Sequence, residues 1–125
     1  MSFHHHLHSL SRDVRDRTDC VVGRANAAVV KARVEGLRQS GEWVGSDVVD
    51  AAAQLYGYFD ELCAGLGSDA CELIRQQQTG EVLFHSEADQ AVIDAALRRR
   101  VKTTIDRTTA KRLVEVLQSA DWSGT

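Results

Sequence analysis

The sequence predicts an all-α fold: a helical bundle of three long helices plus one short connecting helix, completed by oligomerisation. Proline, the strongest helix breaker, is absent from the 125 residues. Apolar residues recur at intervals of three and four over long stretches, as on one face of a helix. The composition, 43% hydrophobic and 26% charged, is that of an ordinary globular domain. Apolar stripes of this length indicate that helices of a second copy complete the core.

The first eleven residues are rich in histidine, with His4, His5, His6 and His8 in five positions. Such a cluster is able to bind a transition metal ion. The simpler interpretation is a mobile His-rich leader over residues 1–11, which takes no part in the fold. The expected organisation is therefore this leader, a single helical-bundle domain over residues 12–120, and a tail over residues 121–125.

The first long helix is expected over residues 12–40. Its apolar stripe consists of residues spaced by four or three, which are Val14, Thr18, Val21, Ala25, Ala28 and Ala32. The small alanines on this stripe would allow a partner helix to approach closely. Ser40-Gly41 ends the pattern.

The second and third helices are expected over residues 46–66 and 69–79. Ser46 is a good N-cap, and the second helix has the most regular stripe in the chain, made of Val48, Ala52, Leu55, Phe59, Leu62 and Leu66. In the third helix Asp69 and Glu72 resemble a capping box, and Cys71 and Ile74 are expected to face inward. The apolar link Val82-Leu83-Phe84 is expected to close one end of the bundle.

The last helix is expected to be continuous over residues 86–119. Ser86 is a good N-cap, and helical spacing continues through Ile93, Leu97, Val101 and Ile105. A break near Thr103-Thr104 is the alternative, because threonine loses side-chain freedom in a helix.

The most unusual feature is the segregation of charge. Residues 98–112 carry seven cationic side chains against one acid, Asp106, a net charge of +6, so the rest of the chain carries −9. If this segment is one helix, Arg100, Thr104, Arg107 and Lys111 lie within about 60° of one another. They would form a basic stripe that carries one hydroxyl group.

This stripe predicts a non-enzymatic binding module that contacts the phosphate backbone of RNA or DNA, because arginine and threonine donate to phosphate oxygens. The predicted contact residues are Arg99, Arg100, Lys102, Thr104, Arg107 and Lys111. Two alternatives remain. The arginines pair with acids of the second helix, namely Asp47, Asp50, Asp60 and Glu61. In the second alternative the chain is a protein-interaction or assembly subunit, whose basic helix contacts an acidic protein surface.

Tyr58 and Trp43 are the candidates for contact with a protein partner. Tyr58 lies off the apolar stripe of the second helix, and aromatic residues are enriched at the centres of interfaces. Trp43 lies in the short link before that helix. Packing within the domain is the alternative for both.

No catalytic motif is present, so no enzymatic activity, cofactor or metal site is expected. The three cysteines, Cys20, Cys63 and Cys71, are expected to be reduced and buried, as in an intracellular, cytoplasmic protein. A zinc site made of Cys63, Cys71 and His85 is the alternative, although it lacks a fourth ligand. Neither a signal peptide nor a membrane span is expected.

Three short stretches resemble known families, and none covers the chain. Trp43-Val44-Gly45 between two helices resembles the small secreted helical hairpins named for a W-x-G turn. Residues 101–105 followed by 109–117 resemble the strand and first helix of ribbon-helix-helix DNA-binding proteins. Residues 93–100 with Arg107 are similar to the RNA-contacting helix of rod-shaped plant virus coat proteins. The chain is assigned to none of these families.

Overall fold

The computed structural model describes residues 3–122, and all regular secondary structure in that range is helical. The elements are α1 (Phe3–Asp13), the short 3-10 helix η1 (Arg17–Asp19), α2 (Cys20–Gln39), α3 (Ser46–Leu66), α4 (Ser68–Gln78), α5 (Glu87–Arg98) and α6 (Arg107–Ser119). The all-α prediction is therefore confirmed. The predicted division into three long helices and one short helix is not observed, because the expected last helix is two helices and α1 precedes α2.

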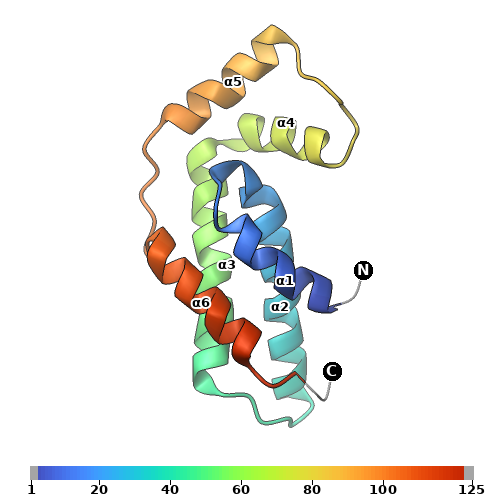
Figure 1. Ribbon diagram of the computed structural model, residues 1–125, viewed down its shortest axis with the longest axis vertical. Coiled ribbons are helices and arrows are strands. Elements are labelled where there is room, and N and C mark those ends of the chain that lie inside the picture. Colours follow the sequence, from blue (N-terminus) through green and yellow to red (C-terminus); the bar gives the residue numbers. More distant parts are fainter. Residues whose placement is uncertain (1–2, 123–125) are drawn as a thin grey trace.

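α1, α2, α3 and α6 pack together along the length of the molecule (Figure 1), and all six α-helices of residues 3–122 contribute to one hydrophobic core. α2 and α3 run antiparallel along the length of the molecule, α1 packs on α2, and α6 packs on α3 and also contacts α1. The largest fully buried side chains include Leu10, Leu55, Phe59, Leu66 and Leu117. α4 and α5 form a second pair at one end, where α4 contacts α2 and α3. None of the described helices is both long enough and apolar enough to cross a bilayer.

The segment expected to be a mobile leader is instead part of the fold. From Phe3 onward it is helix α1, and Leu7, Leu10 and Val14 are buried against the rest of the core. These three side chains are spaced by three and four residues, which places them on one face of the helix. The histidines occupy mainly the other side, where His4, His5 and His8 are exposed.

The inward face of α2 differs from the predicted stripe. Its buried residues are Cys20, Gly23, Asn26, Ala27, Val30 and Val34, whereas Ala25, Ala28 and Ala32 are exposed. The helix also begins later than expected, because the chain turns between α1 and α2. Asp16 stabilises this turn by accepting a hydrogen bond from the Thr18 amide at 3.0 Å. The rotation of α2 allows Gly23 to lie directly against the ring of Phe59.

The predictions for residues 46–78 are confirmed more closely. α3 spans the predicted range, and every residue of its predicted apolar stripe is buried. The N-cap positions of α3 and α4 are Gly45 and Gly67 rather than Ser46 and Asp69. Ile74 is buried and Cys71 is half-buried.

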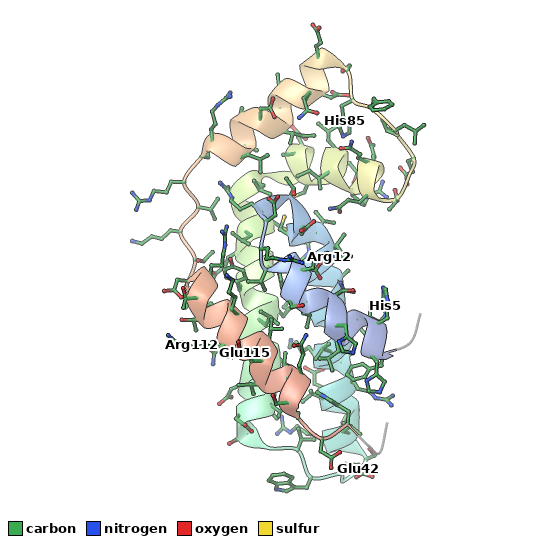
Figure 2. The ribbon with its side chains drawn as sticks, viewed as in Figure 1. His5, Arg12, Glu42, His85, Arg112 and Glu115 are labelled. Atoms are coloured by element: carbon green, nitrogen blue, oxygen red, sulfur yellow. The ribbon has the colours of Figure 1, made fainter. Side chains whose placement is uncertain are left out.

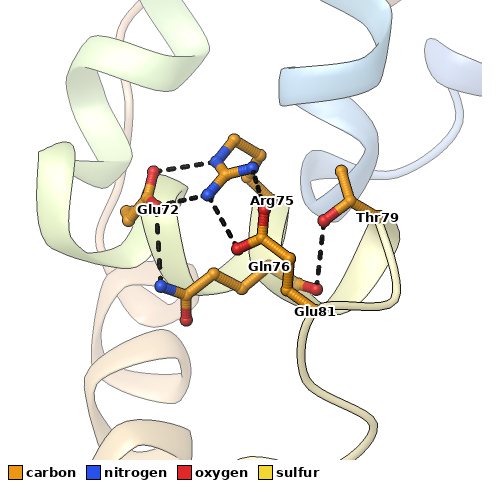
Figure 3. A network of polar contacts seen from close by, with 5 residues as sticks. All are labelled: Glu72, Arg75, Gln76, Thr79 and Glu81. Carbon is orange, nitrogen blue, oxygen red and sulfur yellow. Dashed lines mark hydrogen bonds and ion pairs between the residues drawn. The ribbon is translucent and has the colours of Figure 1, made fainter.

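The loop after α4 is held by polar contacts rather than by its apolar residues. Leu83 and Phe84 are 75% and 86% exposed, so the prediction that they close the bundle is wrong. Instead, Arg75 donates to Glu72 on its own helix at 2.6 and 2.9 Å and to Glu81 in the loop at 2.9 and 3.1 Å (Figure 3).

The expected last helix is interrupted by an irregular linker, residues 99–106, between α5 and α6. Four of the five residues 101–105 are β-branched and therefore lose side-chain freedom in a helix. Repulsion between neighbouring cations adds to this cost. The Ser86 side chain caps α5 as predicted, and Asp106 caps α6 by accepting from the Thr109 amide at 2.7 Å. The break near the two threonines, which was the alternative, is the observed arrangement.

The expected tail is also packed as far as it is described. The Trp122 side chain is 7% exposed, and its ring N–H donates to the Leu117 carbonyl at 2.7 Å. Its ring meets that of Phe3 edge-on, with centroids 4.9 Å apart. The helical domain therefore extends on both sides of the predicted range 12–120.

Candidate functional site

The cationic segment, residues 98–112, lies on three elements. Arg98 is the last residue of α5, Arg99, Arg100 and Lys102 lie in the linker, and the remaining cations lie on the first turns of α6. Figure 2 shows Arg112 on the outer side of α6 and long nitrogen-tipped side chains that project away from the molecule along the linker.

The linker has the alternating exposure of an extended chain. Val101, Thr103 and Ile105 are half-buried, whereas the residues that alternate with them and flank them are exposed, namely Arg100, Lys102, Thr104 and Asp106. Successive side chains of extended backbone point to opposite sides, at about 3.3 Å per residue. Arg100 and Lys102 are therefore neighbours on the outer side of the linker.

Backbone contacts with Arg17 fix the start of the linker. The Arg17 guanidinium donates to the carbonyls of Leu97 and Arg99 at 2.8 Å each, and to the Ala96 carbonyl at 3.4 Å. These carbonyls belong to the C-terminal end of α5, where a cation is favourable. Arg99 itself donates to the Leu66 carbonyl at 2.8 Å and thereby ties the linker to the end of α3.

The middle of the linker docks on α3. A Cβ atom placed on Gly65 would lie 2.4 Å from Val101 Cγ1, so only glycine allows Val101 to approach this closely. Glu61 accepts hydrogen bonds from both the amide and the hydroxyl group of Thr104. These hydrogen bonds lower the pKa of the Glu61 carboxyl group. The predicted role of Thr104 as a phosphate donor is thus replaced by an anchoring role.

The predicted basic stripe on one helix is not formed. Arg107 and Lys111 share a face of α6, but Arg100 and Thr104 lie on the linker, because the helix is interrupted. The arginines do not pair with acids of α3: within residues 3–122, none of the ion pairs within 4.0 Å involves the cations of this segment. Asp60 pairs instead with Arg24, at 3.4 Å.

The two predicted partner-contact residues are placed differently. Tyr58 is 4% exposed, so it belongs to the core of the domain and the prediction that it faces a partner is wrong. Its ring packs edge-on against Phe59. Trp43 is 90% exposed in the link between α2 and α3, and it stays a candidate for contact with another molecule.

A second cluster, which the sequence did not predict, consists of all three cysteines. Cys20, Cys63 and Cys71 come from α2, α3 and α4, and their sulfur atoms all lie within 4.8 Å of one another. All three are free thiols. The structure thus groups Cys63 and Cys71 with Cys20, whereas the zinc alternative grouped them with His85. Spacing along the chain gives no signal for this cluster, because residues 20 and 63 meet only when α2 packs on α3.

A buried polar network joins α1 to α2. Asn26 donates to Asp13 at 2.7 Å, and the Asn26 side-chain oxygen lies 2.8 Å from Nδ1 of His6. Asp13 is 1% exposed, and its other carboxylate oxygen has no hydrogen-bond partner. Burial accordingly raises the pKa of Asp13. The network contains no nucleophile, and we assign it a structural role.

Comparisons of this chain with protein-family models, with curated proteins and with solved structures found no match.

Proposed function

We propose that this protein is a non-enzymatic module that binds the phosphate backbone of a nucleic acid through its cationic segment. The observation that carries the proposal is that Arg98, Arg100, Lys102, Arg107 and Lys111 are all exposed and form no ion pair with the carboxylates of residues 3–122. Their charge is therefore available to an outside anion.

The linker supports the proposal because its backbone is held in place. Arg17 attaches its start to α5, Arg99 attaches its start to α3, and Glu61 attaches its middle to α3. Arg100 and Lys102 thus project from an ordered backbone, and less conformational entropy is lost on binding than for a free tail. Arg107 and Lys111 add two cations one helical turn apart on α6.

The chemistry favours contact with phosphates over reading of bases. Residues 98–112 contain no aromatic side chain on which a base could stack. Arginine and lysine contacts to phosphates position a protein on a nucleic acid without sequence information. We therefore expect weak sequence preference and strong dependence on salt.

The test is a fluorescence-anisotropy titration of the protein against labelled duplex RNA and duplex DNA at 50 mM and 200 mM salt. Five phosphate contacts predict a loss of affinity of about 10²–10³-fold between these concentrations on duplex DNA. Arg100→Glu should weaken binding without unfolding the protein, and the double variant Arg100→Glu/Arg107→Glu should weaken it further. Arg38→Glu, at an exposed position in the last turn of α2, makes the same charge change as the single variant and should bind almost normally. Absence of binding at 50 mM salt, or equal loss in the Arg38→Glu variant, would exclude the proposal.

A second candidate function, assembly with a protein partner, is favoured by a separate observation. Trp43, Phe84 and Leu83 are 90%, 86% and 75% exposed, and large exposed apolar side chains are common at interfaces between proteins. Sedimentation equilibrium tests self-assembly directly. A mass above that of the monomer that returns to the monomer value in Trp43→Ser or Phe84→Ser supports this candidate, and a monomer at all concentrations excludes the homo-oligomer.

A further inference from the structure

We propose that Cys20, Cys63 and Cys71 form a binding site for one thiophilic metal ion, such as zinc(II) or copper(I), held by three thiolates. The inference is independent of the nucleic-acid proposal, since the cysteines take no part in the cationic segment. It rests on the geometry of the cluster, on its electrostatic surroundings and on its access to solvent.

The fold brings the three sulfurs together from positions far apart in the chain. Cys20 is the first residue of α2, Cys63 lies in the last turn of α3, and Cys71 lies in the first turn of α4. Gly67, with a φ of 91°, makes the sharp turn between α3 and α4 that allows Cys63 and Cys71 to meet. The Cys71 thiol lies 3.2 Å from the Cys63 carbonyl oxygen, to which it donates.

The distances fit a bound ion after a small adjustment. The sulfur atoms lie within 4.8 Å of one another. An ion with metal–sulfur bonds of about 2.3 Å holds its sulfurs about 3.8–4.0 Å apart. The thiols therefore need to close by about 1 Å or less, which rotation about side-chain bonds supplies. Soft thiolate ligands select zinc and copper(I) over calcium or magnesium.

A cation lies beside the cluster. Arg24 lines the same groove as Cys63 and Cys71, where it also pairs with Asp60 at 3.4 Å. A divalent ion with three thiolates carries one net negative charge, which Arg24 would partly offset. Binding displaces the thiol protons to solvent, so the affinity should fall as the pH is lowered.

The cluster has a route to solvent. Cys20 is fully buried, but Cys63 and Cys71 line an open groove together with Arg24, Asp60 and Glu72. An ion enters from this side, and a water molecule from the groove is able to complete the four ligands that zinc prefers. Arg75, also on the groove, is occupied by Glu72 and Glu81 (Figure 3). The rim is thus held in place by contacts that leave the groove open beside Cys63 and the half-buried Cys71.

The test must separate thiolate binding from binding by the histidines of α1. The starting protein is therefore the full chain with His4→Ala, His5→Ala and His8→Ala, in which three exposed histidines are removed and His6 is kept for its contact with Asn26. The reduced, metal-free protein is titrated with cadmium(II), whose bonds to thiolates give charge-transfer absorption in the ultraviolet. Zinc(II) and copper(I) are then added as competitors.

We expect the absorption to saturate at one cadmium ion per chain, to disappear as zinc(II) displaces cadmium, and to be replaced by the copper(I)–thiolate absorption as copper(I) displaces it. The unfolding temperature should rise in the presence of cadmium(II) and of zinc(II), because each ion binds the folded chain and not the unfolded one. Cys71→Ser, at the half-buried position, should retain the helical circular-dichroism spectrum. Its affinity for cadmium should fall by more than about 10–100-fold, which is the loss expected when a residue that only hydrogen-bonds to a metal ligand is removed. Ser68→Ala, at an exposed residue on the same groove, is the matched control and should bind normally.

Several results would overturn the proposal. One is the absence of thiolate charge-transfer absorption with cadmium together with the absence of a shift in unfolding temperature. Another is unchanged affinity in Cys71→Ser. A third is a stoichiometry of one ion per two chains, which would place the ligands between molecules.

Discussion

Substitution of Gly23 by alanine tests the face of α2 that is turned to the core. A Cβ atom at this position would lie 2.3 Å from Phe59 Cε1, whereas carbon atoms in contact are normally about 3.5–4.0 Å apart. Phe59 is fully buried, and the close packing of protein interiors leaves such a ring little room to move. Overpacking of this kind costs about 1–3 kcal/mol, against a gain of about 1 kcal/mol in helix propensity. The free energy of unfolding should therefore fall by up to about 2 kcal/mol.

Gly57→Ala is the matched control, because Gly57 is also in the middle of a helix and its added Cβ atom would meet nothing within 4 Å. This variant should gain about 1 kcal/mol from helix propensity alone. Because both variants have the same gain in helix propensity, their free energies of unfolding should differ by about 1–3 kcal/mol, which is the cost of the contact with Phe59. Urea denaturation followed by circular dichroism measures both. If Gly23→Ala were stabilised as much as Gly57→Ala, Gly23 would not face Phe59 and the orientation of α2 would be wrong.

Three further predictions concern α1 and α5. Leu10→Ala should lower the free energy of unfolding by about 2–5 kcal/mol, because Leu10 is fully buried, whereas Leu83→Ala at an exposed site should change it by less than about 0.5 kcal/mol. Equal effects in urea denaturation would show that α1 is not docked. Asp13→Asn should stabilise the protein at neutral pH, and thermal unfolding should show this gain vanishing as the pH falls toward 3.8. Burial raises the folded-state pKa of Asp13 above that ordinary value, so only the ionised form carries the penalty. A gain independent of pH would contradict this cause. Ser86→Ala removes the cap of α5 and should speed hydrogen exchange of its first-turn amides, including that of Asp89, as expected for a loss of about 1 kcal/mol. Unchanged exchange would count against the cap.

The sequence predicted the parts of the fold in which one signal dominates. α3 has strong apolar residues at regular spacing, so its range and the burial of its apolar stripe were both predicted, although Tyr58, which is also buried, was placed outside the core. In α2 the apolar residues are small and occur on several faces. The face of α2 that is turned to the core includes Asn26, a polar residue that is buried because Asp13 from α1 is its hydrogen-bond partner. A hydrophobic pattern does not select such a residue. In α1 the histidines obscured the spacing of Leu7, Leu10 and Val14.

For the candidate sites, the sequence showed which residue types are present but not how they are arranged in space. The excess of cations over residues 98–112 was evident, and their exposure agrees with that expectation. Their arrangement was not, because the helix is interrupted without glycine or proline and the linker is fixed by Arg17, some 80 residues earlier in the chain. The thiol cluster was likewise invisible, since it depends on how α2, α3 and α4 pack.

The contact between α1 and α6 bears on how the chain folds during synthesis. The side chain of Gln118 donates to the carbonyl of Leu7, across a separation of 111 residues. α1 therefore emerges from the ribosome well before one of its two packing partners has been made, and its apolar face stays incompletely covered until residue 118 has been translated. We expect the nascent domain to reach its native packing late, and to depend in the meantime on chaperones that shield short apolar helices.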